Sequence, residues 1–223
     1  MPGALGLFGG TFDPVHYGHL RAAAEVRDAL GLAEMRLLPA GDPAHRAAPQ
    51  ANAMHRLAML ELALQAFPGL VIDSREIHRT GKSYTVLTLE ELRAEMPARP
   101  IACVVGADTF AGLPEWHRWR EVFDLAHLVV VTRPGLRIEG ALTGALRAEW
   151  EKRMTPDLAA LETAPGGAIF RVPVTPQPIS ATAIRDALAS GPAGAAKVRG
   201  LLPAEVFTYI DRHQLYRPRS DAT

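Results

Sequence analysis

The sequence predicts an α/β fold in which helices cover both faces of a parallel sheet. Apolar runs of strand length alternate with helical patterns along most of the chain, and this order is typical of parallel strands joined by helical crossovers. The strand-like runs are continuous stretches rich in Val, Ile and Leu, as strands buried on both faces require. At 223 residues the chain can bury one sizeable core.

Six strands are expected along the chain, and helical patterns separate most of them. The strands are expected at 4–8, 35–39, 70–73, 101–105, 128–132 and 168–172. The helices between them are expected at 18–30, 53–66, 84–96, 119–125 and 139–154. After a proline-rich stretch come two further helical patterns, at 182–190 and 203–213. We therefore expect a core at 1–178 and a small C-terminal helical extension at 179–223, together forming one structural unit.

The composition excludes several classes of protein. Lys plus Arg and Asp plus Glu both number 24, so the balance argues against a strongly basic nucleic-acid binder. The only cysteine, Cys103, lies in an apolar run and is expected to be a buried strand residue rather than a nucleophile. No apolar run reaches membrane-spanning length, and no secretory signal peptide is recognised at the N-terminus. These features indicate a cytoplasmic protein without a membrane partner, and they leave a homo-oligomer open.

The stretch 9–19, Gly-Gly-Thr-Phe-Asp-Pro-Val-His-Tyr-Gly-His, carries the strongest functional signal. Gly9 and Gly10 follow an apolar strand, where glycine lets the backbone approach a ligand closely. His16 and His19 open the next helix, and their spacing lets both rings face the same way. The N-terminus of a helix suits phosphate, so the segment predicts a phosphate site with two imidazoles directed into it. The alternative is an ordinary strand–turn–helix connection whose histidines are surface residues.

This segment resembles the His-x-Gly-His signature of the nucleotidylyltransferase superfamily, and a second signature supports the resemblance. Residues 179–185, Ile-Ser-Ala-Thr-Ala-Ile-Arg, are similar to the Ile-Ser-x-Thr-x-Ile-Arg element of that superfamily. The resemblance implies a dinucleotide-binding-like (Rossmann-like) fold and a site for ATP, with Mg²⁺ carried by the ATP phosphates. It also implies an ATP site built from Gly9, Gly10, Thr11, Phe12, Gly18, Gly106, Asp108, Ile179, Ser180 and Thr182.

The reaction implied by the resemblance is adenylyl transfer, in which a phosphate oxygen attacks the α-phosphorus of ATP and pyrophosphate leaves. Such a reaction depends on alignment and on stabilisation of charge. His16 and His19 are therefore expected to bind phosphate and stabilise the transition state, and Arg185 to hold the β- and γ-phosphates. Ser180 is also a good helix N-cap. No metal site made of protein side chains is expected.

Segments in the middle of the chain resemble bacterial nicotinate-nucleotide adenylyltransferases and imply nicotinate mononucleotide as the acceptor. The similar segments are 39–46, 55–60, 81–85, 106–110, 114–119 and 131–135. In the first of them this chain has Pro-Ala-His-Arg where the family usually has Pro-Pro-His-Lys. The residues expected to bind the acceptor are Arg46, Ser83, Tyr84, Thr85, Trp116 and Arg133.

Other functions fit the sequence less well. Lys82 and Ser83 lack the earlier glycine of a P-loop, and no Gly-x-Gly-x-x-Gly follows the first strand, which argues against an NAD-dependent dehydrogenase. The nearest alternative is another small-molecule adenylyltransferase, such as pantetheine-phosphate adenylyltransferase. A non-catalytic nucleotide-binding protein is a second alternative. A fragment related to aminoacyl-tRNA synthetases would need a basic face and a lysine-rich signature, and neither is found.

Overall fold

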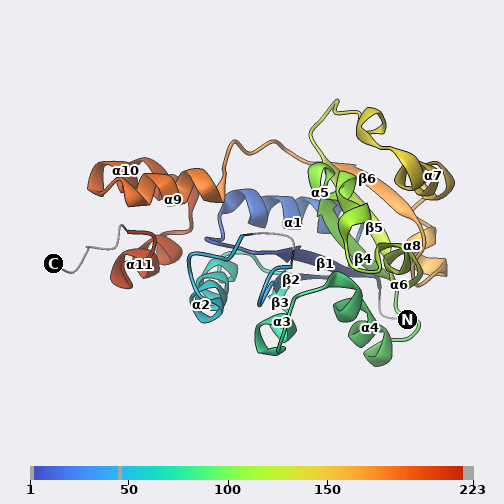
Figure 1. Cartoon of the computed structure of the whole chain (residues 1–223), viewed down its shortest axis with the longest axis horizontal. Helices are drawn as coiled ribbons and strands as arrows, with labels where there is room; N and C mark the ends of the chain where they lie inside the picture. The colour runs from blue at the N-terminus through green and yellow to red at the C-terminus, as the bar shows by residue number, and fades with distance from the viewer. Residues whose placement is uncertain (1–2, 45–46, 218–223) are drawn as a thin grey trace.

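The sheet at the centre of the molecule contains six strands, all parallel. The computed structural model describes residues 3–44 and 47–217. The strands are β1 (Leu5–Gly10), β2 (Glu34–Pro39), β3 (Leu70–Ile72), β4 (Ile101–Gly106), β5 (His127–Thr132) and β6 (Ile169–Pro173). Their order in the sheet is β3-β2-β1-β4-β5-β6 (Figure 1). The connections therefore run in opposite directions on the two sides of the β1–β4 pair, and ligands bind at such a switch point in open sheets of this type.

The longer helices of the core connect consecutive strands. They are α1 (Tyr17–Ala29), α2 (Ala53–Leu64), α4 (Thr85–Glu95) and α7 (Gly144–Arg153). Shorter helices are α3 (Arg75–His78), α5 (Ala107–Ala111), α6 (Val122–Leu125) and α8 (Ala160–Thr163), with 3₁₀ turns η1 (Leu113–Glu115), η2 (Trp119–Glu121) and η3 (Glu139–Ala141). The α/β fold with a parallel sheet is confirmed, and no helix among residues 3–44 and 47–217 has both the length and the apolar character to span a membrane.

Two buried clusters of apolar side chains lie against the sheet, as the alternation along β4 shows. Ile101, Cys103 and Val105 belong to one cluster, while Ala102 and Val104 belong to the other. Successive side chains of a strand point to opposite faces, so both faces are buried. Helices α1 and α2 pack in the cluster of Val104, and α4, α6 and α7 pack in that of Cys103. Cys103 is a buried strand residue as expected, and burial raises the pKa of its thiol to about 12.

The C-terminal extension consists of α9 (Ala181–Ala189), α10 (Pro192–Val198), the turn η4 (Arg199–Leu201) and α11 (Ala204–Arg212). These elements lie at one end of the molecule, with α11 beside α2 (Figure 1). Ile184, Val206 and Ile210 are buried in the same cluster as the side chains of α1 and α2. The extension is therefore packed on the core through an apolar interface.

Several helical segments differ from the sequence prediction, which also did not include the short helices α3 and α8. The pattern 119–125 forms η2 followed by α6. The pattern 139–154 forms η3 and α7, with two extended residues, Leu142 and Thr143, between them. Gly144 at the start of α7 has a φ of +52°, a conformation that glycine adopts without steric cost. Helix α10 was not predicted, because its Ala/Gly composition hides it. Gly194 there lies so close to the Ala187 carbonyl that a Cβ atom would stand 2.1 Å from the oxygen, which explains the glycine at this position.

Candidate active site

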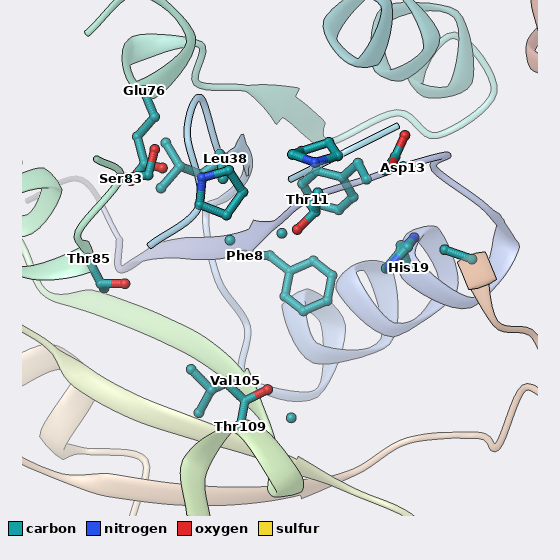
Figure 2. Close-up of a pocket in the computed structure, with 18 of the residues that line it drawn as sticks. Phe8, Thr11, Asp13, His19, Leu38, Glu76, Ser83, Thr85, Val105 and Thr109 are labelled. Atoms are coloured by element: carbon teal, nitrogen blue, oxygen red, sulfur yellow. The ribbon is translucent and has the colours of Figure 1, made fainter. Parts of the chain in front are cut away.

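A cavity of about 690 Å³ opens at the carboxyl ends of β1, β2 and β4. Its walls come from the loop after β1, the segment between β2 and α2, the start of α4, and the start of α9. In Figure 2, Asp13 and His19 stand on one side of the cavity, while Ser83, Thr85 and Glu76 stand on the other. Segments separated by more than a hundred residues thus meet at the switch point of the sheet.

The two histidines of the first motif lie at the start of α1, where they were expected. His16 is the N-cap residue and His19 lies in the first turn. Their rings stack, with centroids 3.7 Å apart and planes inclined by 21°, and both line the cavity. Phe12 meets the His19 ring edge-on, with centroids 5.1 Å apart. The predicted common orientation of the two rings is therefore confirmed.

Burial makes His16 a neutral residue at physiological pH. Its side chain is 5 % exposed, and desolvation lowers its pKa from 6.5 to about 4. Its Nδ1 atom has no hydrogen-bond partner among the described residues. A neutral imidazole carries one N–H donor and one acceptor nitrogen. His16 can therefore donate a hydrogen bond to a ligand without bringing a positive charge.

Glycines of the motif provide space for the rings around them. A Cβ atom on Gly18 would stand 2.9 Å from Nδ1 of His16, and one on Gly10 would stand 2.9 Å from the Phe12 ring. Gly9 faces open space, with nothing within 4 Å of its Cβ direction. Gly9 and Gly10 line the cavity, whereas Gly18 supports it by leaving room for His16.

The second motif reaches the same cavity from the C-terminal extension. Ser180 is the N-cap of α9, where its hydroxyl accepts a hydrogen bond from the Ala183 amide at 3.5 Å. Arg185 donates from Nη1 to the Asp13 carbonyl at 2.7 Å and from Nη2 to the Thr182 hydroxyl at 3.2 Å. Its Nε is buried without a hydrogen-bond partner among the described residues. Both the capping of Ser180 and the approach of Arg185 to the first motif are thus observed.

The opposite end of the cavity is formed by the start of α4 and the turn after α5. Tyr84 is the N-cap of α4, and Thr85 is its first residue. The Ser83 hydroxyl accepts a hydrogen bond from the Gly41 amide at 3.0 Å. Trp116 is half-buried and completes this end. The structure therefore brings these four residues of the predicted acceptor site to one wall.

The remaining predicted site residues have mixed positions. Asp108 and Arg133 are exposed, and neither lines the cavity. Ile179 packs against the core near α9. Gly106 lies at the cavity wall together with Thr109. Arg46 lies outside the residues that the structure describes.

Four residues that were not predicted as site residues lie in the cavity wall or in contact with it. Asp13, Arg56, Glu76 and Tyr216 are all buried, and Asp13 and Glu76 line the cavity. Arg56 had a detectable signal, because it stands four residues before Leu60 on the buried stripe of α2. A cation on an apolar helix face indicates a buried polar network. Tyr216 had no such signal, since its contact is made across 203 residues.

Carboxylates at the cavity are already hydrogen-bonded. Asp13 accepts bonds on both oxygens, from the Gln50 and Ala51 amides and from the Tyr216 hydroxyl. The Glu76 carboxylate accepts a hydrogen bond from the Thr88 hydroxyl at 2.6 Å. In the part of the chain that the structure describes, no group of three or more His, Cys, Asp or Glu side chains could hold a metal ion.

Sequence comparison gives a family for the chain. Residues 7–187 match the cytidylyltransferase-like family. A protein of Halorhodospira halophila named "Probable nicotinate-nucleotide adenylyltransferase" is 50 % identical over 202 residues, which cover 91 % of this chain and 90 % of that protein. A protein of Laribacter hongkongensis with the same name is 50 % identical over 220 residues, covering 98 % and 97 % respectively.

The fold is also that of a solved structure of lower sequence similarity. The Plasmodium falciparum nicotinic acid mononucleotide adenylyltransferase, solved in complex with NaAD, superposes with a TM-score of 0.71. It shares 14 % identity with this chain, and the match covers 96 % of this chain and 97 % of the other. At this identity the likeness concerns the fold alone.

Proposed function

The chain belongs to the nicotinate-nucleotide adenylyltransferase family within the cytidylyltransferase-like proteins, and from this premise we propose that it transfers the adenylyl group of ATP to nicotinate mononucleotide. The products are deamido-NAD and pyrophosphate, and the reaction serves NAD biosynthesis. The observation that carries the proposal is the meeting of His16, His19 and Arg185 at one cavity. These groups offer hydrogen-bond donors and a positive charge to the phosphates of ATP.

In the proposed reaction an oxygen of the nicotinate mononucleotide phosphate attacks the α-phosphorus of ATP. A new bond forms between that oxygen and the α-phosphorus. The bond between the α-phosphorus and the oxygen that bridges it to the β-phosphate breaks, and its electron pair leaves with pyrophosphate. No proton has to be removed from the attacking phosphate, so no general base is needed. Catalysis then rests on alignment and on donors directed at the developing charge. We assign that role to His16 and His19.

The leaving pyrophosphate is assigned to Arg185 and the start of α9. The guanidinium carries five N–H donors in a planar fork, of which two contact Asp13 and Thr182. The buried Nε, which has no hydrogen-bond partner among the described residues, can donate to a phosphate oxygen. Ser180 and Thr182 at the N-terminus of the helix add hydroxyl donors where phosphate is favoured.

ATP is proposed to enter as its Mg²⁺ complex. Asp13 and Glu76 already accept hydrogen bonds, and the described residues offer no cluster of metal ligands. An ion carried by phosphate oxygens and water fits this site, and it is the usual mode for Mg²⁺. When bound, the ion neutralises charge on the phosphates.

The acceptor's pyridine ring is assigned to the wall of Ser83, Tyr84, Thr85 and Trp116. Trp116 offers an aromatic surface for stacking. The start of α4 offers backbone N–H groups without partners in the helix, together with the positive end of its dipole. These donors match a carboxylate, whereas an amide would turn its own NH₂ group toward some of them. Each donor left unpaired costs about 1–3 kcal/mol, which favours the acid.

Glu76 favours the amide mononucleotide as a second acceptor. Its buried carboxylate lines the same end of the cavity, where it could accept a hydrogen bond from an amide and would repel a carboxylate. The helix dipole and the hydroxyls of Ser83 and Thr85 oppose this effect. The balance of these groups sets the preference between the two acceptors.

The assay is pyrophosphate release with ATP, Mg²⁺ and either mononucleotide, with kcat/KM measured under identical conditions. We expect ATP and Mg²⁺ to give pyrophosphate only when a mononucleotide acceptor is also supplied. We expect kcat/KM for the acid to exceed that for the amide by at least about tenfold. Thr85→Val should reduce the ratio of kcat/KM for the acid to that for the amide, because it removes a hydrogen-bond donor. Glu76→Gln should increase this ratio, because it removes a negative charge. Equal values for the two acceptors would overturn the assignment of the pyridine site, and the absence of turnover with either would overturn the proposed function.

A further inference from the structure

The first motif is held by a network of buried polar groups centred on Asp13, and this network extends to Arg185. Asp13 is 5 % exposed, and its carboxylate accepts three hydrogen bonds. Two come from the amides of Gln50, at 2.8 Å, and Ala51, at 3.1 Å. The third comes from the Tyr216 hydroxyl, at 2.7 Å. Asp13 is therefore fixed from the segment before α2 and from the end of the C-terminal extension.

The charge of the carboxylate is balanced by a cation that reaches the same loop by another route. Arg56 is 1 % exposed and donates to three backbone carbonyls: Thr11 at 2.7 Å, Gly41 at 3.1 Å and Ala51 at 3.3 Å. Burial lowers the pKa of Arg56, and the nearby Asp13 carboxylate opposes that shift. A buried charge without such partners would be strongly unfavourable. Asp13 and Arg56 together hold residues 11–13.

The backbone in this loop needs such support. Phe12, between the two held residues, has a φ of +50°, in the left-handed region that an aromatic residue rarely adopts. Conformations of this kind persist where the surroundings over-determine them, and they gather at functional sites. Phe12 is buried and contacts the His19 ring, so the conformation of the loop also sets a neighbour of the catalytic histidines.

The carbonyl of Asp13 is the point at which the network meets the proposed chemistry. It accepts the hydrogen bond from Nη1 of Arg185 at 2.7 Å. We propose that Asp13 is a positioning residue for Arg185: its carboxylate, anchored by Tyr216, fixes the peptide whose carbonyl orients the guanidinium toward the leaving pyrophosphate. This inference rests on the proposed function, since it concerns the phosphate-binding role of Arg185.

Tyr216→Phe is the variant that tests the proposal, because it removes one hydroxyl at nearly constant shape. The matched control is Tyr209→Phe, also in the C-terminal extension, whose hydroxyl lies 3.0 Å from Nδ1 of His55 and away from Asp13. The reverse reaction, from deamido-NAD and pyrophosphate to ATP, reports on Arg185 directly. We expect Tyr216→Phe to raise KM for pyrophosphate about tenfold, as loss of a hydrogen bond to a charged group implies. KM for deamido-NAD should stay within about twofold, and Tyr209→Phe should change neither constant.

The same change in an Arg185→Ala background separates positioning from general stability. If Tyr216 acts through Arg185, the second substitution adds no further increase in KM for pyrophosphate, and the two effects are non-additive. Equal effects of Tyr216→Phe in both backgrounds, or a lowered Tm with unchanged KM for pyrophosphate, would overturn the proposal.

Calorimetric titration with ATP and Mg²⁺ measures the effect of Tyr216→Phe on the Kd for ATP in the wild-type and Arg185→Ala backgrounds, without turnover. Weaker ATP binding by Tyr216→Phe that disappears in the Arg185→Ala background supports the positioning role even if the assigned acceptor is wrong. Failure of the wild-type protein to use either mononucleotide, with this coupling intact, would instead count against the proposed function alone.

Discussion

His19 and His16 share a cavity, yet their surroundings give them different properties. His16 is enclosed as the N-cap of α1, with its ring beneath Gly18 and against His19. His19 is half-buried and meets Phe12 edge-on. The stacked arrangement presents two imidazoles to one ligand region, where each can contribute a donor. Their separate contributions can be measured by single substitutions.

We expect His19→Ala to lower kcat by about a hundredfold or more, because a preorganised donor to the developing charge is lost. Thermal unfolding of this variant should remain close to that of the wild type, since the side chain is not part of the apolar core. Steady-state kinetics with ATP and nicotinate mononucleotide provide the measurement. A variant with near-normal kcat would show that His19 has no role in the chemical step.

His16 should make the folded protein sensitive to acid. Its pKa of about 4 in the folded state lies below the ordinary value of 6.5, so the unfolded chain binds the proton more readily. The free energy of unfolding contributed by this difference is fully present above pH 6.5 and is lost as the pH falls toward 4. Between pH 7.5 and pH 5 the loss amounts to about 2 kcal/mol.

Denaturant unfolding of the wild type and His16→Gln at these two pH values checks this expectation. The wild type should lose about 2 kcal/mol more than the variant. His127 is also buried with a lowered pKa, but it is present in both proteins and cancels in the difference. The exposed His78 gives the control variant His78→Gln, which should follow the wild type. Identical losses for all three proteins would contradict the burial effect assigned to His16.

Local patterns made part of the site predictable from the sequence. The three-residue spacing of His16 and His19 and the N-cap position of Ser180 depend only on neighbours along the chain. Asp13 was not predicted as a site residue, because its hydrogen-bond partners lie 37 to 203 residues away along the chain. Arg133 follows its strand as predicted but faces solvent, because the end of a strand does not fix the direction of the next side chain.

At the scale of elements, α9 is the helix that connects the extension to the cavity. One side of it buries Ile184 and Leu188 in the core, and the neighbouring Arg185 reaches back to the loop after β1. The helix can therefore hold the guanidinium on a rigid support. Helix α9 therefore fixes the orientation of the planar guanidinium as well as the position of its charge.

Arg185→Lys keeps the charge and removes the fork, so we expect kcat/KM for ATP to fall by at least about tenfold. Arg199→Lys is the matched control, because Arg199 belongs to the same extension and lies over the Phe207 ring, 4.9 Å from its centroid. Initial rates at varied ATP concentration give both values. An Arg185→Lys protein as active as Arg199→Lys would show that charge alone suffices.

Prediction of the elements succeeded where the apolar pattern was long and failed where short turns interrupted it. All six strands were found, because each carries apolar residues that pack against the core, and β4 is the longest continuous apolar run among them. The sequence placed the glycines after the first strand, whereas Gly9 and Gly10 still pair with β2. Helix α10 was missed because its Ala/Gly composition does not indicate a helix, although Gly191, with a φ of +92°, is its N-cap residue and Pro192 is its first residue.

At the scale of the whole molecule, the extension and the core share one apolar cluster. Ile184, Val206 and Ile210 bury against residues of α1 and α2, and Tyr216 is buried against Asp13. The division at residue 178 therefore stays a prediction about sequence organisation. The packing favours a single cooperative unit.

We expect a protein ending at residue 178 to lack a cooperative thermal transition, because the cluster around α1 and α2 would lose its cover. Circular dichroism and calorimetry of the shortened and full-length chains give the comparison. The full-length chain should show one transition, with the same midpoint by both methods. A shortened protein that melts cooperatively near the wild-type Tm would show that residues 1–178 fold independently.

The hydrogen bond between Tyr216 and Asp13 also has a consequence for biosynthesis. The two residues are 203 positions apart, so a ribosome adding 5–20 residues per second needs roughly 10–40 s between them. During that interval the nascent loop after β1 lacks its last anchor, and Arg185 reaches the loop only near the end. The strands can pair while translation continues, but the nucleotide site is completed only when the final helices emerge.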